Sequence, residues 1–354
     1  MAKFIAFYLP QFHPTPENDE WWGPGFTDWR TVNMAKPLFK GHAQPRVPAD
    51  LGYYDLRLEE SRIQQAEMAK EYGIDAFCYW HYWFGNGKRL LNYPFDEVVR
   101  SGKPDFPFCL GWANHSWYKK AWGGKGSDEL LIEQQYFGEE DFVLHFNTML
   151  PAFKDDRYFR HNGKLLFIIY QPLADESISL FIRVWRKLAK ENGLNDFFFI
   201  GKDSYSRNKK EILEIGFDAI YNDNIFGILH RESLVSKGFR YIKKKFFSLP
   251  MVFEYKNAIK YMLTDEERSE DVVPEIVPNW DHSPRSGATQ AIFIHTEPKF
   301  FKQLVHKACL LANGKRNDLV LIKSWNEWGE GNYLEPDLQY GRGMLEALKE
   351  GINS

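Results

Sequence analysis

Two glutamates near the end of the chain, Glu327 and Glu330, have residue types and a spacing that suit acid–base chemistry. They lie in the stretch SWNEWGEG, which runs from Ser324 to Gly331 and sets them between two tryptophans and two glycines. A buried carboxylate is costly unless it is paired or hydrogen-bonded, so acids beside tryptophans need a compensating reason. Breaking or forming a glycosidic bond needs one carboxyl group to protonate the leaving oxygen and a second to act as base or nucleophile. Neighbouring carboxylates beside apolar rings should raise the pKa of one of them, as a general acid requires.

The glycines in this stretch indicate how both side chains can face one cavity. A straight strand would point Glu327 and Glu330 to opposite sides, whereas Gly329 and Gly331 permit a turn. A bare E-x-x-E pair is more often an exposed, salt-bridged turn. The tryptophans and the apolar strand that precedes them favour the functional interpretation.

Length and composition exclude several classes. The 354 residues suit one large α/β barrel or two ordinary domains, and the net charge of −3 and pI near 6.4 do not indicate nucleic acid as a partner. Three cysteines without CxxC spacing are expected to be reduced core residues. No apolar run reaches the ~20 residues that span a bilayer, and no leader pattern precedes the first strand, so we expect a cytoplasmic protein unless a leader was removed.

The apolar runs of the chain alternate with segments of helical spacing, which predicts a parallel sheet. The predicted strands are 4–9, 75–80, 106–113, 165–170, 197–201, 218–222, 275–280 and 319–325, and the predicted helices are 56–72, 139–153, 177–192, 299–312 and 343–350. Eight repeats predict a single (β/α)8 TIM barrel over residues 1–354 with long βα loops, namely a loop at 13–56 and a less regular segment at 228–274. An open doubly wound sheet is the alternative, but no G-x-G-x-x-G follows the first strand.

Aromatic and polar residues gather where this barrel should carry its active site, at the carboxyl ends of the strands. Eleven of the 12 tryptophans fall at strand ends or in the loops after them, and aromatic rings that line a cleft suit sugar faces. Lys202, Asp203, Asn222 and Asp223 lie at the same ends. The candidate substrate-binding residues are Tyr8, Gln11, His13, Trp80, His81, Tyr82, Trp112, Asn114, His115, Trp117, Tyr170, Asp281, Arg285, Asn326, Trp328 and Glu335.

Motifs along nearly the whole chain carry a family resemblance. They are FYLPQFHP, WWGPGFTDWRTV, GHAQPRVPADLGYYDL, GIDAFCYWHYWF, WANHSW, NWDHSPR and SWNEWGEGNYLEP. In this order they resemble glycoside hydrolase family 99 and the related WbsX-like proteins of bacterial surface-polysaccharide gene clusters. The resemblance implies a (β/α)8 barrel and a retaining endo-α-mannosidase that passes through a 1,2-anhydro sugar. Glu327 would then be the base at the sugar 2-hydroxyl, and Glu330 the acid/base at the glycosidic oxygen.

The chain departs from the WbsX-like pattern after the third strand. It has WANHSWYKKAWGG, with His115 in place of an acid and Gly123 in place of an aspartate. WbsX-like proteins have also been described as glycosyltransferases, but this chain has no Gly-rich phosphate loop and no DxD triplet.

Three other functions compete with a glycoside hydrolase or transglycosylase that acts on an oligosaccharide or polysaccharide. They are a sugar-nucleotide-dependent glycosyltransferase, a glycan-binding barrel without activity, and a metal-dependent hydrolase that uses His81, His115, Asp281 and His282. We expect no cofactor and no metal, because neither a His-x-His pair nor H-E-x-x-H occurs. A separate basic and aromatic run, KGFRYIKKKFF from Lys237 to Phe247, is by default a solvated surface and alternatively a peripheral contact with an anionic membrane.

Overall fold

The computed structural model describes residues 2–119, 128–204, 206–225, 227–231, 250–289 and 291–354 of the chain. Within these residues a path of nine parallel strands runs in the order β12-β10-β9-β8-β4-β2-β1-β15-β13. These strands are β1 (Lys3–Tyr8), β2 (Ala76–Trp83), β4 (Phe108–Trp112), β8 (Lys164–Ile169), β9 (Phe197–Asp203), β10 (Ala219–Asn222), β12 (Val272–Val273), β13 (Glu275–Ile276) and β15 (Leu319–Ile322). Their apolar side chains are almost all buried, as expected for a sheet covered on both faces.

The barrel closes through one short segment that carries both β12 and β13. Val272 pairs with Ile220 of β10, and Glu275 pairs with Leu321 of β15, so the two ends of the path belong to one stretch of chain. Pro274 separates the two because it has no N–H to give to a ladder, although its carbonyl still accepts from the Leu321 amide at 2.8 Å. The path thus has eight strand positions, which confirms the predicted TIM barrel. The predicted bounds of the seventh strand, 275–280, were wrong by a few residues.

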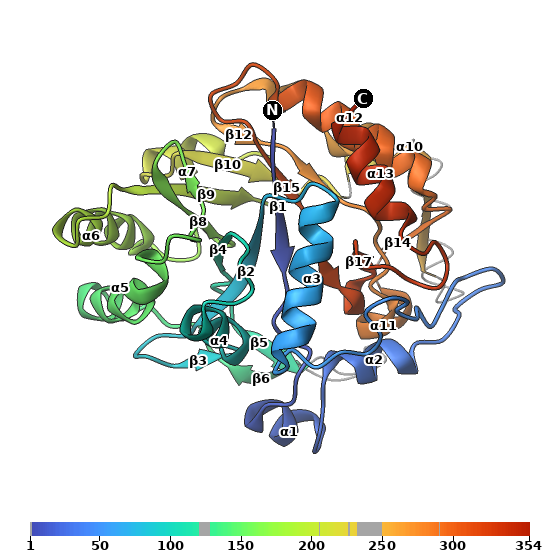
Figure 1. Ribbon diagram of the computed structural model, residues 1–354, viewed down its shortest axis with the longest axis horizontal. Helices are drawn as coiled ribbons and strands as arrows, with labels where there is room; N and C mark the ends of the chain where they lie inside the picture. Colours follow the sequence, from blue (N-terminus) through green and yellow to red (C-terminus); the bar gives the residue numbers. More distant parts are fainter. Residues whose placement is uncertain (1, 120–127, 205, 226, 232–249, 290) are drawn as a thin grey trace.

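Helices follow the barrel strands and lie on the outside of the barrel (Figure 1). They are α3 (Glu59–Glu71), α4 (Tyr93–Ser101), α5 (Glu139–Phe153), α6 (Ile178–Glu191), α7 (Lys209–Glu214), α10 (Tyr255–Met262), α12 (Pro298–Ala312) and α13 (Gly343–Ile352). The five predicted helices are confirmed to within about three residues at each end, whereas α4, α7 and α10 were not predicted. Figure 1 also shows α12 and α13 side by side, a contact that joins the end of the chain to the barrel wall.

The long loops carry elements of their own at the carboxyl ends of the strands. After β1 come α1 (Pro16–Trp22) and α2 (Asp28–Met34), and after β4 comes the antiparallel pair β5 (Trp117–Lys119) and β6 (Glu129–Ile132). After β13 comes α11 (Ser283–Ser286), and after β15 come β16 (Asn326–Glu327), η3 (Trp328–Glu330) and β17 (Asn332–Tyr333). The remaining short elements are β3 (Arg89–Leu90), β7 (Arg160–His161), α8 (Gly227–Arg231), β11 (Met251–Glu254), η1 (Asp265–Arg268), η2 (Gly287–Thr289) and β14 (Ala291–Ile294).

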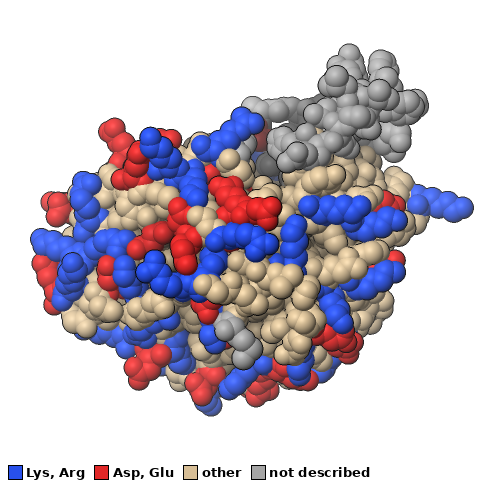
Figure 2. All heavy atoms as spheres, turned by 90° about the horizontal axis from the view of Figure 1, so that it is seen from above, with Lys and Arg blue, Asp and Glu red and all other residues tan. Residues whose placement is uncertain are grey.

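The surface charges and the state of the cysteines are those expected from the composition. On the face shown in Figure 2, Lys and Arg side chains are interspersed with Asp and Glu. Cys78, Cys109 and Cys309 are free and buried, as predicted. In the described part of the chain, the search for a helix of sufficient length and hydropathy to cross a bilayer found none.

Candidate active site

The stretch SWNEWGEG folds as a small antiparallel ribbon at the carboxyl end of β15. Asn326 pairs with Tyr333 and Glu327 with Asn332, and the single 3-10 turn η3 joins the two strands. Gly331 ends this turn with φ of 62°, the left-handed region that glycine adopts without strain. The ribbon brings Glu327 and Glu330 to one side, as the glycine pattern predicted.

Gly329 allows the ribbon to approach two charged neighbours. A Cβ atom at this position would lie 2.5 Å from Arg285 Nε and 2.5 Å from Asp28 Oδ2. Real Cβ atoms essentially never come this close to another heavy atom, so any side chain here would displace both groups. Glycine is therefore required by proximity at this position.

One guanidinium joins three carboxylates beside the ribbon. Arg285, from α11, places Nη2 2.7 Å from Asp28 Oδ2 and 2.9 Å from Glu327 Oε1, and places Nη1 3.0 Å from Glu330 Oε1. The contacts with Asp28 and Glu330 are hydrogen bonds, whereas that with Glu327 is an ion pair without hydrogen-bond geometry. Because the nitrogens of a guanidinium form a rigid planar fork, Arg285 holds the two glutamates at a set separation.

The two glutamates differ in protonation. Burial raises the pKa of Glu327 well above its usual value, and the charges of Glu330 and Asp28 add to this against the opposing charge of Arg285. Burial would also raise the pKa of Glu330, but a hydrogen bond from His282 and the charges of His282 and Arg285 outweigh it, and the net shift is downward. The two pKa values are thus shifted in opposite directions, as those of one acid and one base should be.

A cavity of about 680 Å³ opens above this cluster. This volume falls within the roughly 300–1,000 Å³ typical of small-molecule sites. Its aromatic lining comes from five different loops or strands and includes Trp21, Trp22, Trp80, Tyr82, Trp117, Tyr170 and Trp280. The arrangement offers apolar ring faces around a pair of carboxyl groups, which matches the mixed polarity of sugar rings.

The loop after β1 supplies two of these rings through α1. Thr15 caps this helix by accepting a hydrogen bond from the Asn18 amide at 3.1 Å, and Pro16 occupies its first turn. The ammonium of Lys119 in β5 donates to the Trp21 carbonyl at 2.9 Å, which ties α1 to the β5–β6 pair. Trp21 and Trp117 consequently meet edge to face, with ring centres 6.0 Å apart.

Of the residues predicted to bind substrate, seven line this cavity beside the two glutamates. They are Gln11, Trp80, Tyr82, His115, Trp117, Tyr170 and Arg285. Burial lowers the pKa of His115 to about 4, so its ring is neutral at pH 7. The role of these residues in substrate binding stays a prediction.

The other nine predicted residues lie behind the wall, and their expected place in the cavity is corrected. They are Tyr8, His13, His81, Trp112, Asn114, Asp281, Asn326, Trp328 and Glu335, all less than 9% exposed. Their sequence positions at strand ends are those of cavity residues, but their side chains are buried and none of the nine is among the residues that line the cavity. His13 is buried with a pKa lowered to about 4 by burial, and His81 pairs with His145 through a 2.7 Å contact.

Several of these buried residues support the ribbon from below. Asn326 exchanges hydrogen bonds with the backbone of Leu9, accepting at 2.7 Å and donating at 3.0 Å. Glu335 accepts from Trp328 Nε1 at 2.6 Å and from the Tyr54 hydroxyl at 2.8 Å. Gln65 links this network to Tyr8, because it donates to Glu335 at 2.7 Å and accepts from the Tyr8 hydroxyl at 2.6 Å.

Some of the tryptophans line the cavity, and others are buried beneath it in the protein core. Trp328 stacks on Tyr333 with ring centres 3.7 Å apart, and Trp325, Trp112 and Trp83 are also completely buried. The expectation that nearly all loop tryptophans line the cleft was therefore too broad, because a ribbon that carries buried acids needs apolar anchors of its own. Trp122 and Gly123 lie outside the described residues, as does the run from Lys237 to Phe247.

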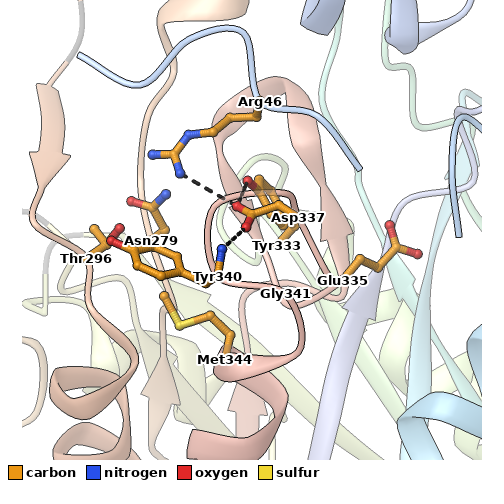
Figure 3. A pocket seen from close by; sticks show the side chains of 9 residues that line it. All are labelled: Arg46, Asn279, Thr296, Tyr333, Glu335, Asp337, Tyr340, Gly341 and Met344. Carbon is orange, nitrogen blue, oxygen red and sulfur yellow. Dashed lines mark hydrogen bonds and ion pairs between the residues drawn. The ribbon is translucent and has the colours of Figure 1, made fainter. Parts of the chain in front are cut away.

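A second group of polar side chains, formed around Arg46 and Asp337, links the loop after β1 to the segment that follows the ribbon. Figure 3 shows Arg46 reaching towards Asp337, which also accepts from the Tyr333 hydroxyl at 2.7 Å and the Tyr340 amide at 2.7 Å. The cavity in this view measures about 10 Å³, which is room for one water and too small for a sugar.

Asp281 lies nearby and contacts both the loop after β1 and the ribbon. Its Oδ2 lies 2.8 Å from His42 Nε2, and its amide donates to the Glu330 carbonyl at 2.8 Å. Asp281 is thus a support for Glu330.

Three residues at the site escaped prediction as partners of the glutamates. Asp28 and Lys323 were not selected as candidates, and His282 was considered only as a metal ligand. His282 Nε2 lies 3.5 Å from Glu330 Oε1. Nothing in the sequence around Asp28 marks it as a partner of Arg285, since the two are joined only by folding. Among the described residues, no group of three or more His, Cys, Asp or Glu side chains is placed to hold a metal ion.

Comparison with solved structures identifies the class of fold. A glycoside hydrolase-like protein aligns with a TM-score of 0.62 and 17% identity over 99% of this chain and 94% of its own. The glycoside hydrolase family 99 endo-α-mannosidase from Bacteroides thetaiotaomicron aligns with a TM-score of 0.57 and 15% identity over 95% of this chain and 87% of its own. The chain therefore has a glycoside-hydrolase-like barrel fold.

The sequence comparison identifies the family. The chain belongs to the family described as glycosyltransferase WbsX, whose model matches residues 4–348. Two proteins of Xanthomonas campestris pv. campestris, each described as uncharacterized protein WxcX, are 35% identical to it over 362 residues. The match covers 99% of this chain and 50% of each relative, so the chain spans about half the length of these relatives. The resemblance stated from the motifs is confirmed.

Proposed function

We propose that this chain is a retaining glycoside hydrolase or transglycosylase that acts on a bacterial surface polysaccharide or its precursor. The observation that carries the proposal is the pair Glu327 and Glu330, held on one guanidinium at the base of an aromatic cavity. The fold shared with a family 99 endo-α-mannosidase supports an α-mannoside-like linkage and a neighbouring-group mechanism. A sugar-nucleotide-dependent glycosyltransferase, the activity in the family's description, is the alternative.

The mechanism needs no nucleophile from the protein. Glu327 takes the proton of the sugar 2-hydroxyl, and the freed oxygen attacks C1 from the face opposite the leaving group. Glu330 gives a proton to the glycosidic oxygen as the C1–O bond breaks, which leaves a 1,2-anhydro sugar. Water, or a sugar hydroxyl in the case of transfer, then opens this ring at C1. Glu330 takes the proton of that nucleophile while Glu327 returns its proton to O2, which restores both groups.

The directions of the two pKa shifts run against these roles. Burial raises the pKa of Glu327, and His282 and Arg285 lower that of Glu330, whereas the mechanism starts with the proton on Glu330. The mechanism therefore requires that a bound sugar changes the contacts of the two glutamates with Arg285 and His282 and raises the pKa of Glu330. If the bound complex carries the proton on Glu327 instead, the two roles are exchanged.

The first test is incubation of wild-type protein with surface polysaccharides and their lipid-linked precursors in heavy-oxygen water, followed by mass spectrometry. The proposal expects heavy oxygen at new reducing ends with the wild type, and a loss of about 100-fold or more with Glu330→Gln. Glu350→Gln, on the outer helix α13, is the matched control and should behave as wild type. Unlabelled, rearranged chains would identify transfer to a sugar, and turnover that requires a nucleotide sugar would favour the glycosyltransferase.

A second test separates the acid from the base. A substrate with an aryl leaving group needs little protonation, so the variant that lacks the general acid should keep much of its activity on it. We expect Glu330→Gln to retain this activity and Glu327→Gln to lose it. The opposite pattern would mean that the roles are exchanged, and equal activity of both variants and wild type would contradict the mechanism.

A further inference from the structure

One cation on the cavity wall, Lys323, forms an ion pair with a carboxylate but, within the described part of the chain, donates no hydrogen bond to one. Lys323 follows β15 directly, and its ammonium lies 5.4 Å from the centre of the Trp280 ring. Both side chains line the cavity, as does that of Asp223. The Lys323 side chain is 16% exposed, so its ammonium is reached from the cavity but is largely shielded from bulk water.

The carboxylate closest to Lys323, that of Asp223, also contacts a second lysine. Asp223 Oδ2 lies 2.8 Å from the ammonium of Lys202 and 3.6 Å from that of Lys323. The longer contact is an ion pair beyond hydrogen-bond distance. Lys202 itself is 5% exposed and lies behind the wall, 4.0 Å over the Tyr170 ring. Lys202 and Lys323 therefore share one carboxylate, so these three side chains carry one positive charge in excess.

A buried acid behind Lys323 cancels only part of this charge. Glu275, on β13, is 5% exposed, and burial raises its pKa to about 7 in spite of the opposing charge of Lys323. It is thus partly protonated near neutral pH. The charge of Lys323 also lowers the pKa values of Glu327 and Glu330, which places it within electrostatic reach of both.

We propose that Lys323 recognises an anionic group of the sugar substrate, either the carboxylate of a uronic acid or a phosphate, next to the bond on which Glu327 and Glu330 act. This inference rests on the proposed function and narrows its substrate to an acidic glycan that carries either uronic acid or phosphorylated sugar residues. A partly buried ammonium binds a charged oxygen more strongly than a hydroxyl, because charge-assisted hydrogen bonds are shorter and stronger.

A different role for Lys323 makes different predictions. If Lys323 acted only by lowering the pKa values of the two glutamates, its loss would shift the pH–rate profile equally for neutral and acidic substrates. A recognition role instead changes binding of the acidic substrate alone. The two are therefore separated by comparing matched substrates.

The first experiment uses wild-type protein and four probes. Mannuronic acid trisaccharide is compared with mannotriose, and mannose 6-phosphate with mannose, by isothermal titration at low and high salt. We expect at least one acidic probe to bind roughly 10-fold or more tightly than its neutral partner, with an advantage that shrinks in high salt. The pair that shows the advantage identifies the carboxylate or the phosphate as the source. Neutral probes that bind as tightly as acidic ones would overturn the inference alone, whereas no binding of any probe would count against the proposed function as well.

The second experiment uses variants at the same position. Lys323→Met and Lys323→Gln should both lose the preference for the acidic probe while binding of the neutral probe stays within about twofold, and Lys323→Arg should keep the preference. Lys164→Met, at the opposite end of the barrel in β8, removes a lysine that is ion-paired with Asp196 and Asp218, and it should change neither. Retained preference in Lys323→Gln would show that a hydrogen-bond donor suffices, and would overturn the anionic assignment. An equal loss for both probes in a folded variant would do the same.

Discussion

Replacing Gly329 by alanine should disable the site through a single methyl group. Gly329 does not have a positive φ, so alanine brings no backbone strain at this position. Its Cβ would meet Arg285 Nε and Asp28 Oδ2 at 2.5 Å, whereas ordinary contact begins at 3.4 Å. Because both neighbours belong to the same ion cluster, neither can withdraw without disturbing the contacts of Arg285 with the glutamates.

The magnitude follows from the displacement. The ribbon and the Arg285–Asp28 pair must separate by about 0.9 Å, the difference between the two distances. A misplacement of about 1 Å costs on the order of 100-fold in rate, since reacting groups must lie near their attack geometry. Overpacking a tight site costs roughly 1–3 kcal/mol of stability. We therefore expect a folded protein whose kcat is lower by about two orders of magnitude.

The assay compares initial rates on the glycan that is turned over in heavy-oxygen water. Gly351→Ala is the matched control, because its Cβ would meet Val305 at 2.7 Å where α13 packs on α12, away from the cavity. It should lose a similar amount of stability in urea unfolding and almost no activity. Gly329→Ala with a rate within about threefold of wild type would refute the view that Arg285 sets the position of the two acids.

Three other predictions follow from the charges. Arg285→Met should destabilise the protein by about 3–5 kcal/mol at pH 7, because Asp28 and the two glutamates lose their shared cation. Urea unfolding should show a smaller loss of stability at pH 5 than at pH 7. A variant as stable as wild type would contradict the conclusion that Arg285 neutralises these three carboxylates. Burial raises the pKa of Glu335 to about 7 from 4.5, so its protonated form stabilises the fold below about pH 4.5 and this contribution is lost as the pH rises through 7. Between pH 4.5 and pH 7 the free energy of unfolding of wild type should fall by up to about 3 kcal/mol relative to that of Glu335→Gln. Curves of unfolding free energy against pH that run parallel for the two proteins would contradict the raised pKa of Glu335. Neutralising the lysines at 243–245 should reduce flotation with anionic liposomes if this segment contacts membranes, and unchanged flotation would dispose of that proposal.

Much of the fold was predictable because strand and helix periodicity are local signals. The apolar runs of β1, β2, β8 and β15 are buried on both faces and can be read from composition alone. The seventh position was harder to predict because Pro274 divides it into two pairs of residues, each bonded to a different neighbour. Short helices such as α7 escaped prediction because six residues carry too little periodicity.

The residue types in the sequence selected part of the cavity lining, but not the direction of each side chain. Glu327 and Glu330 were selected from their spacing, and the glycines correctly indicated a turn. Strand-end position alone did not distinguish Tyr170, which lines the cavity, from Asn114, which bonds to the Gln171 backbone behind it. Both are polar residues at the ends of neighbouring strands, and only the direction of the side chain separates them.

By itself, the sequence determined the barrel, the family and the two carboxyl groups, because these depend on residue types and on spacings within short stretches. Tertiary structure alone decided which charges meet them. Asp28, Arg285 and Glu327 come from three distant parts of the chain, and their contacts exist only once the loops after β1, β13 and β15 converge. The same convergence pairs Lys202 with Asp223 and leaves Lys323 facing the cavity. Electrostatic interactions act through space and not along the chain, so the protonation of the two glutamates is a property of the fold.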